Sequence, residues 1–180
     1  MLDDGRDWIA SPGSALVSEV VAIDRGSSVI SVREGNAITK TAAEGGVEWR
    51  VGLPASEVAL GVAADTSGSI LVTGQSGSGG NQPSSEAFVR KYSADGGLQW
   101  EVVTATRGGS ATAGMTVTSD DNENVIVAGV TNGVTGTSLR NLGFGDVFLA
   151  KLSSRNGSTL WTRQFGTPQD DFAQGVSTDR

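Results

Sequence analysis

Four tryptophans recur along the 180-residue chain at spacings of 41, 51 and 61 residues, and each follows a turn-forming segment. The segments read DDGRDW, EGGVEW, DGGLQW and NGSTLW, and they end at Trp8, Trp49, Trp100 and Trp161. Between them lie short apolar runs such as ALGVAAD, GSILVTG and EAFVRKY, bounded by Gly, Asp, Asn or Ser. Such runs are typical of β-strands joined by tight turns. The chain is therefore predicted to consist of repeated units of four short strands, without helices.

A unit of about 40 to 60 residues with four sequential strands is typical of one blade of a β-propeller. The 26 glycines, with no G-X-Y period, suit a turn-rich folded chain. The second run of each unit is the most apolar, as ILV and VIV show, which suits a strand buried on both faces. We predict an all-β fold: a partial β-propeller with about three four-stranded antiparallel blades and single terminal strands of two more.

The repeat also predicts where the blades begin and end within 1–180, which we interpret as one incomplete propeller. Full blades are expected at about 19–53, 57–105 and 112–166, after a last strand of a preceding blade at 5–12 and before a first strand of a next blade at 171–178. A closed propeller has about four to eight blades, and exposed strand edges favour association. The expected partners are therefore the remainder of a larger propeller or another copy of the chain.

Composition excludes several kinds of chemistry and partner. Without Cys and His the chain cannot form disulfides, thiolate nucleophiles, Cys/His zinc sites or Ser-His-Asp triads. A net charge of −7 disfavours nucleic acid, because binding phosphate needs an excess of Lys and Arg. No apolar run approaches the roughly 20 residues that span a bilayer, so no membrane insertion is expected. The start, MLDDGRDW, lacks the basic-then-apolar order of a signal peptide.

The segment GDVFLAKLSSRNGSTLWTRQFGTPQDDFAQGVSTD resembles the SBBP-type repeat family, whose members form seven-bladed β-propellers. The matching residues are Asp146, Phe148, Lys151, Gly157, Trp161, Gly166, Asp170, Asp171, Gly175 and Asp179. The resemblance extends back to about residue 57 and is weak before it. It implies a propeller scaffold without assigned catalytic residues, of a kind often found in secreted or surface bacterial proteins. An extracellular or surface location is expected on that ground alone.

The turn before Trp100 is similar to the Asp-box of sialidase-like propellers, with Ser93, Asp95 and Gly97 in the matching places. The same turns have a Gly four residues before the Trp, including Gly157, and so are similar to the tryptophan-docking repeats of quinoprotein propellers. We interpret both motifs as architecture. The acidic side chain bonds backbone N–H groups, a Gly takes a positive φ, and the Trp packs beneath the turn. No central charged site for a quinone is identified.

Calcium is the one cofactor that the residues leave open, and otherwise none is expected. Asp120, Asn122 and Asn124 begin like an EF-hand loop, but the sixth and twelfth places hold Val125 and Thr131, which excludes that motif. A simpler calcium site at Asp120 and Asp121, or at Asp170 and Asp171, is one hypothesis. Solvated hairpin turns are the alternative.

Two long polar loops, GQSGSGGNQPSSE and GVTNGVTGTSLRNLGFGD, join the second to the third strand of their blades and should emerge on one side of the disc. Polar loops on a rigid scaffold are common recognition sites, and Arg140, Asn141 and Phe144 are the candidate ligand-binding residues. Flexible Gly/Ser insertions are the alternative.

The hypothesis that fits these features best is a non-catalytic β-propeller scaffold or interaction module within a larger surface or secreted protein, with a protein or glycan ligand. The alternative is part of a carbohydrate-active propeller, either sugar-binding or a glycoside hydrolase whose catalytic residues lie elsewhere. Hydrolysis needs two carboxylates about 5–9.5 Å apart. Acidic residues that recur at the same place in several blades indicate structure instead, so no catalytic residue is assigned.

Overall fold

The computed structural model describes residues 20–33, 36–77, 85–104, 111–135 and 141–179. Trp8, Arg140 and the strand expected at 5–12 lie outside the described residues.

Twelve strands account for most of the described chain, which contains no helix. The first sheet holds β1 (Val20–Ile23), β2 (Val29–Arg33), β3 (Ala37–Thr41) and β4 (Val47–Gly52). The second holds β5 (Glu57–Ala64), β6 (Ile70–Gly77), β7 (Ser85–Tyr92) and β8 (Leu98–Thr104). The third holds β9 (Thr112–Ser119), β10 (Val125–Thr131), β11 (Asp146–Leu152) and β12 (Thr159–Phe165).

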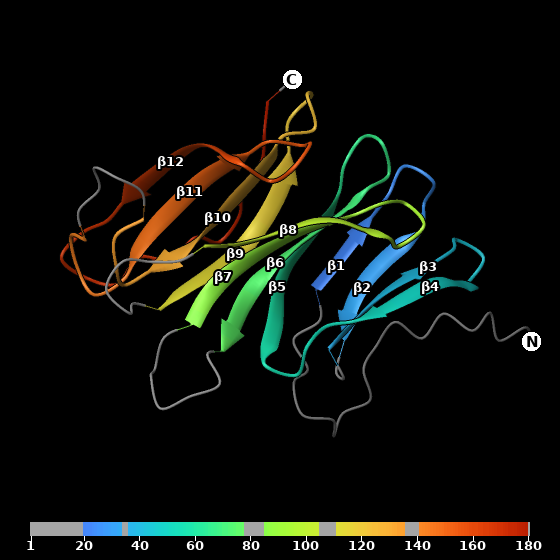
Figure 1. Ribbon diagram of the computed structural model, residues 1–180, viewed down its shortest axis with the longest axis horizontal. Coiled ribbons are helices and arrows are strands. Elements are labelled where there is room, and N and C mark those ends of the chain that lie inside the picture. The colour runs from blue at the N-terminus through green and yellow to red at the C-terminus, as the bar shows by residue number, and fades with distance from the viewer. Residues whose placement is uncertain (1–19, 34–35, 78–84, 105–110, 136–140, 180) are drawn as a thin grey trace, which may run out of the picture.

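Each sheet is an antiparallel meander in which strands pair in chain order. The first strands lie together, because β5 contacts both β1 and β9, whereas β4, β8 and β12 lie at the outer edges. The three sheets stand side by side with their strands running in similar directions (Figure 1). The predicted all-β fold with three four-stranded antiparallel blades is thus confirmed.

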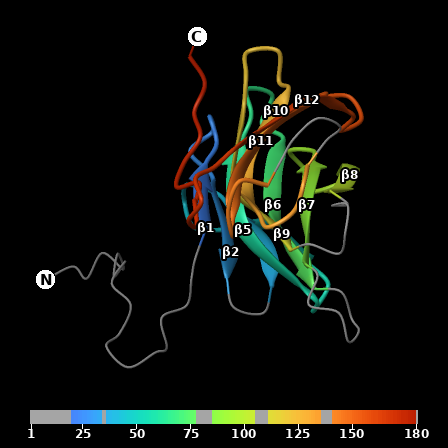
Figure 2. The same ribbon diagram turned by 90° about the vertical axis from the view of Figure 1, so that its left-hand side faces the viewer.

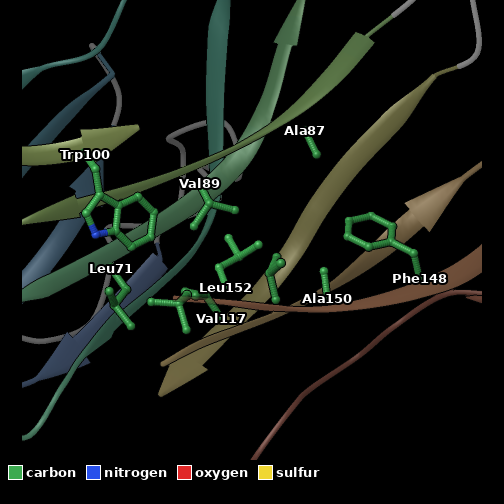
Figure 3. Packing of buried hydrophobic residues seen from close by; sticks show 10 residues of the cluster. Leu71, Ala87, Val89, Trp100, Val117, Phe148, Ala150 and Leu152 are labelled. Carbon is green, nitrogen blue, oxygen red and sulfur yellow. The ribbon is translucent and has the colours of Figure 1, made fainter. Parts of the chain in front are cut away.

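Period-2 alternation places apolar side chains on both faces of the second sheet. In β6, Ile70 and Val72 pack against the first sheet in a cluster with Ile30 and Ile38. Leu71, between them, points the other way and packs in a cluster with residues of the third sheet. Figure 3 shows this second cluster, in which Leu71, Val89 and Trp100 meet Val117 and Leu152. A strand buried on both faces needs the continuous apolar run that the sequence has there.

The strand ends form two faces with different connections. The turn face, as we call it, carries the short turns after the first and third strands, at 24–28, 65–69 and 120–124 and at 42–46, 93–97 and 153–158. The loop face is the opposite side, where the second strands end and the third strands begin. The described ends of the two long loops, at 77 and 85 and at 132–135 and 141–145, therefore lie on one side of the sheets.

Two of the recurring tryptophans pack on the turn of the following blade and not beneath their own. The indole N–H of Trp49 donates to the carbonyl of Ala94 at 2.9 Å, and its ring lies against Gly96. Trp100 is 8% exposed and repeats this contact one blade later, donating to the carbonyl of Ser154 at 3.0 Å and lying against Gly157. The expectation that each Trp packs beneath its own turn is therefore wrong, because the neighbouring blade buries the ring.

The positive φ of the Asp-box-like turn belongs to Gly96, at +89°, whereas Gly97 has no positive φ. A Cβ on Gly96 would lie 2.9 Å from the Trp49 ring. Gly97 instead donates its N–H to Ser93 Oγ at 3.0 Å, and Ser93 Oγ in turn donates to Asp95. We call the contact of a Trp ring with the turn glycine of the next blade a dock. The glycine four residues before a Trp is therefore the one that leaves room for the ring of the preceding blade.

The segment expected as a further first strand, 171–178, pairs with no described strand. It begins at the loop face, where Asp171 N donates to Gly145 O at 2.8 Å, and reaches the turn face, where Thr178 Oγ1 donates to Ser119 O at 3.1 Å. Its path therefore follows β9 from end to end, and Figure 2 draws it in red as a coil that ends at C. A first strand gains its ladder from the second strand of its own blade, which the described residues do not supply.

None of the described residues forms a helix long and apolar enough to cross a membrane.

Candidate functional site

A hollow of about 330 Å³ opens on the turn face, where the first strands of all three blades end. Asp24, Asp65 and Asp120 line it at equivalent places, directly after β1, β5 and β9, and Ser177 and Thr178 close one side. The hollow is polar and lies at the meeting point of the blades, where a propeller could hold a ligand. Whether the three aspartates can bind a ligand depends on the hydrogen bonds and ion pairs that they already make.

In every blade the aspartate closes its own turn. Asp65 Oδ1 accepts hydrogen bonds from Ser67 N and Ser69 N, both at 2.9 Å. Asp120 Oδ1 accepts from Asn122 N and Asn124 N at the same distance, and Asp24 Oδ1 accepts from Ser28 N. These are Asx-type turns, which satisfy backbone donors that the tight connection leaves unpaired.

The second oxygen of each aspartate faces a lysine on the third strand of the same blade. The Nζ–Oδ2 distances are 3.0 Å for Lys40–Asp24, 2.8 Å for Lys91–Asp65 and 2.5 Å for Lys151–Asp120. The side chains of Lys91 and Asp65 are only 4% and 0% exposed. Each of these lysines also pairs in register with the Trp of its blade. The acidic turn, the lysine and the Trp therefore form one structural unit that recurs.

The ion pairs also decide the protonation of their members. Burial opposes ionisation of Asp24, but hydrogen bonds from Lys40 and Ser28 outweigh it, so the pKa of Asp24 lies below its ordinary value. Asp120 behaves alike, with Lys151 and Asn124 holding its pKa down against desolvation. For Lys40, desolvation is outweighed by Asp24 and Glu48, and the pKa is raised. Asp24 and Lys40 are therefore both charged across the neutral range, which suits a structural role.

A different kind of ion pair, which sequence reasoning missed, lies inside the second blade. Arg90 donates to both oxygens of Glu57, at 2.6 and 2.7 Å, and to Glu101 at 2.8 Å. Burial would lower the pKa of Arg90, but the hydrogen bonds to Glu57 and Glu101 outweigh burial and raise the pKa above its ordinary value. The only signal in the sequence is an arginine within the apolar run AFVRKY. The Arg90 guanidinium and the Glu57 carboxylate thus form a bidentate ion pair. The guanidinium also lies 4.9 Å from the Phe88 ring centre.

The structure separates the two acidic pairs considered for calcium. Asp120 and Asp121 line the turn-face hollow, whereas Asp170 lines a hollow on the loop face. Asp171 Oδ2 accepts from Thr167 N at 2.7 Å and so closes a turn of its own. Within the described ranges, no three acidic side chains gather as a group that could hold a metal ion.

The loop-face hollow, about 390 Å³ in volume, lies between the second and third blades. Phe144 stands at its edge with 74% of its surface exposed. Gln75, Asn132 and Asp170 also line it, and their side chains make no hydrogen bond or ion pair with a described residue. An aromatic surface next to an amide donor, an amide acceptor and a carboxylate is thus presented to solvent together.

The loop that carries Phe144 is fixed by polar contacts. Asn141 Nδ2 donates to Asn132 O at 2.6 Å, and its Oδ1 accepts from Gly143 N at 3.1 Å. The buried Asp146 accepts from Leu142 N at 2.9 Å and from Gln164 Nε2 at 2.7 Å. Of the three candidate ligand-binding residues, the structure therefore places Phe144 at a hollow and gives Asn141 a positioning role, while Arg140 lies outside the described residues.

No protein-family model matches the sequence. No curated protein matches it either.

Solved structures with similar folds belong to β-propeller proteins. Quinohemoprotein alcohol dehydrogenase ADHIIG from Pseudomonas putida HK5 is 17% identical over 82% of this chain and 26% of its own, with a TM-score of 0.57. A protein of unknown function from Bacteroides caccae is 12% identical over 83% of this chain and 62% of its own, with a TM-score of 0.51. BamB from Moraxella catarrhalis is 17% identical over 82% of this chain, with a TM-score of 0.42.

At these identities the likeness shows the fold alone: the chain is a β-propeller module. It spans 26% of the length of the dehydrogenase and 62% of the length of the Bacteroides caccae protein. Membership of the SBBP-type family stays a prediction.

Proposed function

We propose that this chain is a non-catalytic interaction module of a larger β-propeller and that its ligand binds at the loop-face hollow beside Phe144. The observation that carries the proposal is the difference between the two faces. The turn-face aspartates are each engaged by a lysine and by backbone N–H groups, in the same way in all three blades. Recurrence in every blade is what a structural role requires, whereas a reactive group belongs to one site.

The loop face supplies what recognition needs. Phe144 offers exposed apolar surface on a loop that Asn141 and Asp146 hold in place, so little conformational entropy is lost on binding. Gln75, Asn132 and Asp170 can orient a polar ligand around it. Exposed loops on a rigid sheet scaffold are common binding sites. The ligand is a protein or a glycan, and the host is a larger surface or secreted protein, as the SBBP-type resemblance implies.

The test is a binding screen on a printed oligosaccharide array and an immobilised peptide library, with wild type and Phe144→Ala compared at equal concentration. We expect Phe144→Ala to lose the wild-type signals without any change in thermal unfolding, because this side chain is exposed. Phe165→Ala on β12 is the matched control, since Phe165 is 51% exposed and does not line the hollow, and it should bind as wild type does. No wild-type signal, or equal binding by Phe144→Ala, would refute the proposal.

Sugar binding is the second candidate, and the combination at this hollow favours it. An aromatic face suits the C–H face of a sugar ring, while amides and a carboxylate suit its hydroxyl groups. Hydrolysis needs a pair of carboxylates, and Asp170 is the one acidic side chain among the described residues that line this hollow. A panel of chromogenic glycosides distinguishes sugar binding from glycoside hydrolysis. A glycan-array signal without turnover indicates binding alone, and turnover of any substrate indicates an enzyme.

A further inference from the structure

The outward face of the third blade repeats a surface that the chain buries at both of its described blade contacts. In each blade a residue of the second strand, a lysine of the third strand and the Trp of the fourth strand pair in register. These rows are Ile30–Lys40–Trp49, Leu71–Lys91–Trp100 and Ile126–Lys151–Trp161. The first row lies on the face that packs on the second blade, and the second row on the face that packs on the third. The third row therefore belongs to a face of the same kind.

In the third blade this face is open to solvent. Trp161 is half-buried, whereas Trp100 at the equivalent place is 8% exposed. The side chain of Lys151 is 25% exposed, against 4% for Lys91. Phe165 lies on the same side of β12 as Trp161 and is 51% exposed. Exposed aromatic side chains grouped on one face mark an interaction site. We call this surface the Trp161 face, which consists of Val147, Leu149, Trp161 and Phe165.

At both described contacts the next blade packs on the Trp row with the same set of groups. The set is two aliphatic residues of its second strand, a Phe of its third strand and the positive-φ glycine of its following turn. These residues are Ile70, Val72, Phe88 and Gly96 in the second blade and Val125, Val127, Phe148 and Gly157 in the third. A partner of the Trp161 face therefore needs this apolar set and this glycine.

A second copy of the chain does not supply that set. Counted from the lysine row, the first blade has Ser31 and Ala37 where the second has Val72 and Phe88. Packing Ser31 against the Trp161 face would remove its hydroxyl from water, and a methyl group does not fill the space of a phenyl ring. The partner is therefore a blade with a more apolar face than the first blade of this chain.

Residues 171–178 lie where the first strand of such a blade would stand. First strands of neighbouring blades lie side by side, as β1 does with β5 and β5 with β9. The segment 171–178 follows β9, with Thr178 Oγ1 donating to Ser119 O at 3.1 Å, and it forms no ladder with a described strand. A partner needs to bring only three more strands, the first of which would pair with this segment.

We propose that the Trp161 face docks one further blade of the larger propeller, whose turn glycine lies against the Trp161 ring and whose second strand pairs with 171–178. A carbonyl of that turn accepts the Trp161 indole N–H, as Ala94 O accepts that of Trp49 at 2.9 Å. The inference rests on the part of the proposed function that makes the chain a module of a larger propeller. It does not depend on a ligand at the loop face.

The test extends the full chain after Arg180 by a copy of residues 67–104, which carry the second to fourth strands of the second blade. The register follows from the sequence, because Gly175, Val176 and Asp179 are spaced as Gly61, Val62 and Asp65 are. Acrylamide quenching, compared with that of Trp161→Phe in the same chain, isolates the Trp161 emission. We expect its quenching constant to fall to that of Trp100 in the natural chain and its emission to shift to shorter wavelength.

Two matched extensions serve as controls. Gly96→Val in the appended copy should leave Trp161 as quenchable as in the natural chain, since a Cβ on Gly96 would lie 2.9 Å from the docked ring. A copy of residues 26–52 in place of 67–104 should also leave Trp161 exposed, because it carries Ser31 and Ala37. Protection of Trp161 by either control as strong as that by the 67–104 copy would overturn the proposed set of contacts.

Hydrogen exchange of the amides of 171–178 shows whether the appended strands fold onto the chain. Protected amides with an exposed Trp161 would overturn the dock, and unprotected amides with an exposed Trp161 would overturn the whole proposal. Light scattering on the natural chain is the last measurement. A dimer in which Trp161 is protected would assign the Trp161 face to a second copy and reject a further blade. Because none of these measurements uses a loop-face ligand, their failure is distinct from failure of the array experiment.

Discussion

At the residue scale, the recurring Asp–Lys pair explains why so many charges sit close to the core. Removing a lysine from water is costly, but a carboxylate at 2.5 to 3.0 Å and a turn that already holds the aspartate offset much of that cost. Backbone donors of the turn already hold each aspartate, so its pairing with the lysine needs little further ordering. The pair thereby links the turn after the first strand to the third strand of each blade.

Removing one partner of the most buried pair should leave a charge without compensation. Lys91→Met strands Asp65, whose side chain is 0% exposed, and we expect a loss of about 3–5 kcal/mol in unfolding free energy. Lys151→Met is the comparison: its pair retains 25% and 15% exposure, so water can solvate the remaining Asp120 and the loss should be smaller. Urea denaturation measures both, and equal losses would mean that burial does not decide the cost.

The pKa shifts of the pairs predict acid and alkaline limits to stability. Asp24 and Asp120 have folded pKa values below the ordinary 3.8, so their contribution is present above that pH and is lost as the pH falls through the folded values. Lys40 has a pKa above 10.5, so its contribution is present below that pH and is lost as the pH rises through the folded value. Urea midpoints measured against pH should fall at both ends. Asp24→Asn should reduce the acid dependence, and an unchanged slope would contradict the assignment.

At the scale of single elements, the fourth strand of each blade connects it to the next. In both described docks the Trp ring crosses from an outer strand to the turn of the next blade, where the glycine leaves room for it. This contact explains why Gly and Trp recur at a separation of four: the second blade presents Gly96 to the first blade and Trp100 to the third. The same strands otherwise carry exposed apolar side chains such as Leu98 and Leu160.

Trp100→Ala should cost about 3–5 kcal/mol of unfolding free energy, since the ring is buried between blades and its loss leaves a cavity. Trp161→Ala should cost less, because Trp161 is half-buried and its indole N–H donates to no described residue. Both are measured by urea denaturation. A loss under about 1 kcal/mol for Trp100→Ala would show that the dock contributes little.

The described start of the connection between β10 and β11, at 132–135, is held by a residue of β12. Gln164 on β12 accepts from Thr135 N at 3.1 Å and donates to Gly133 O at 3.0 Å, which ties the loop to the outer edge of its blade. A residue far along the chain therefore fixes the described start of this connection.

At the scale of the whole molecule, the blades stack as a short one-dimensional array. The second blade is covered on both faces, by the cluster with Ile30 and Ile38 and by the cluster with Val125 and Phe148. The outer face of the first blade lacks such a described cover, and β4 is mostly exposed or half-buried. In arrays of this kind each unit is stabilised by its neighbours.

Amide hydrogen exchange should therefore be slowest in the second blade. We expect the highest protection in β6 and β7, whose residues are mostly buried, and lower protection in β1 and β4. Mass spectrometry on peptides of the full chain measures this. Uniform protection across the three blades would mean that they open as one cooperative unit.

Much of this architecture could be predicted from the chain alone, because strand patterns are local. Alternation of apolar residues and the Gly, Asp and Asn turns repeat within each unit, and the repeat predicted the three four-stranded sheets that the structure has. The run ILV at residues 70–72 even indicated that this strand is buried on both faces.

Contacts between blades depend on how the blades pack against each other, which the sequence of a single repeat unit does not encode. The sequence marked Trp49 and Gly96 as members of separate turns, and only the packing of two blades brought the ring of one onto the other. Likewise, Asp65 and Lys91 are 26 residues apart in the chain, and Glu57 and Arg90 are 33 apart, so their pairing depends on how the strands register. The sequence thus determined the strands and turns, because these follow from neighbouring residues. The tertiary structure decided which charges pair, which turns Trp49 and Trp100 cover and which polar side chains line the loop-face hollow, because those depend on the arrangement of the sheets in space.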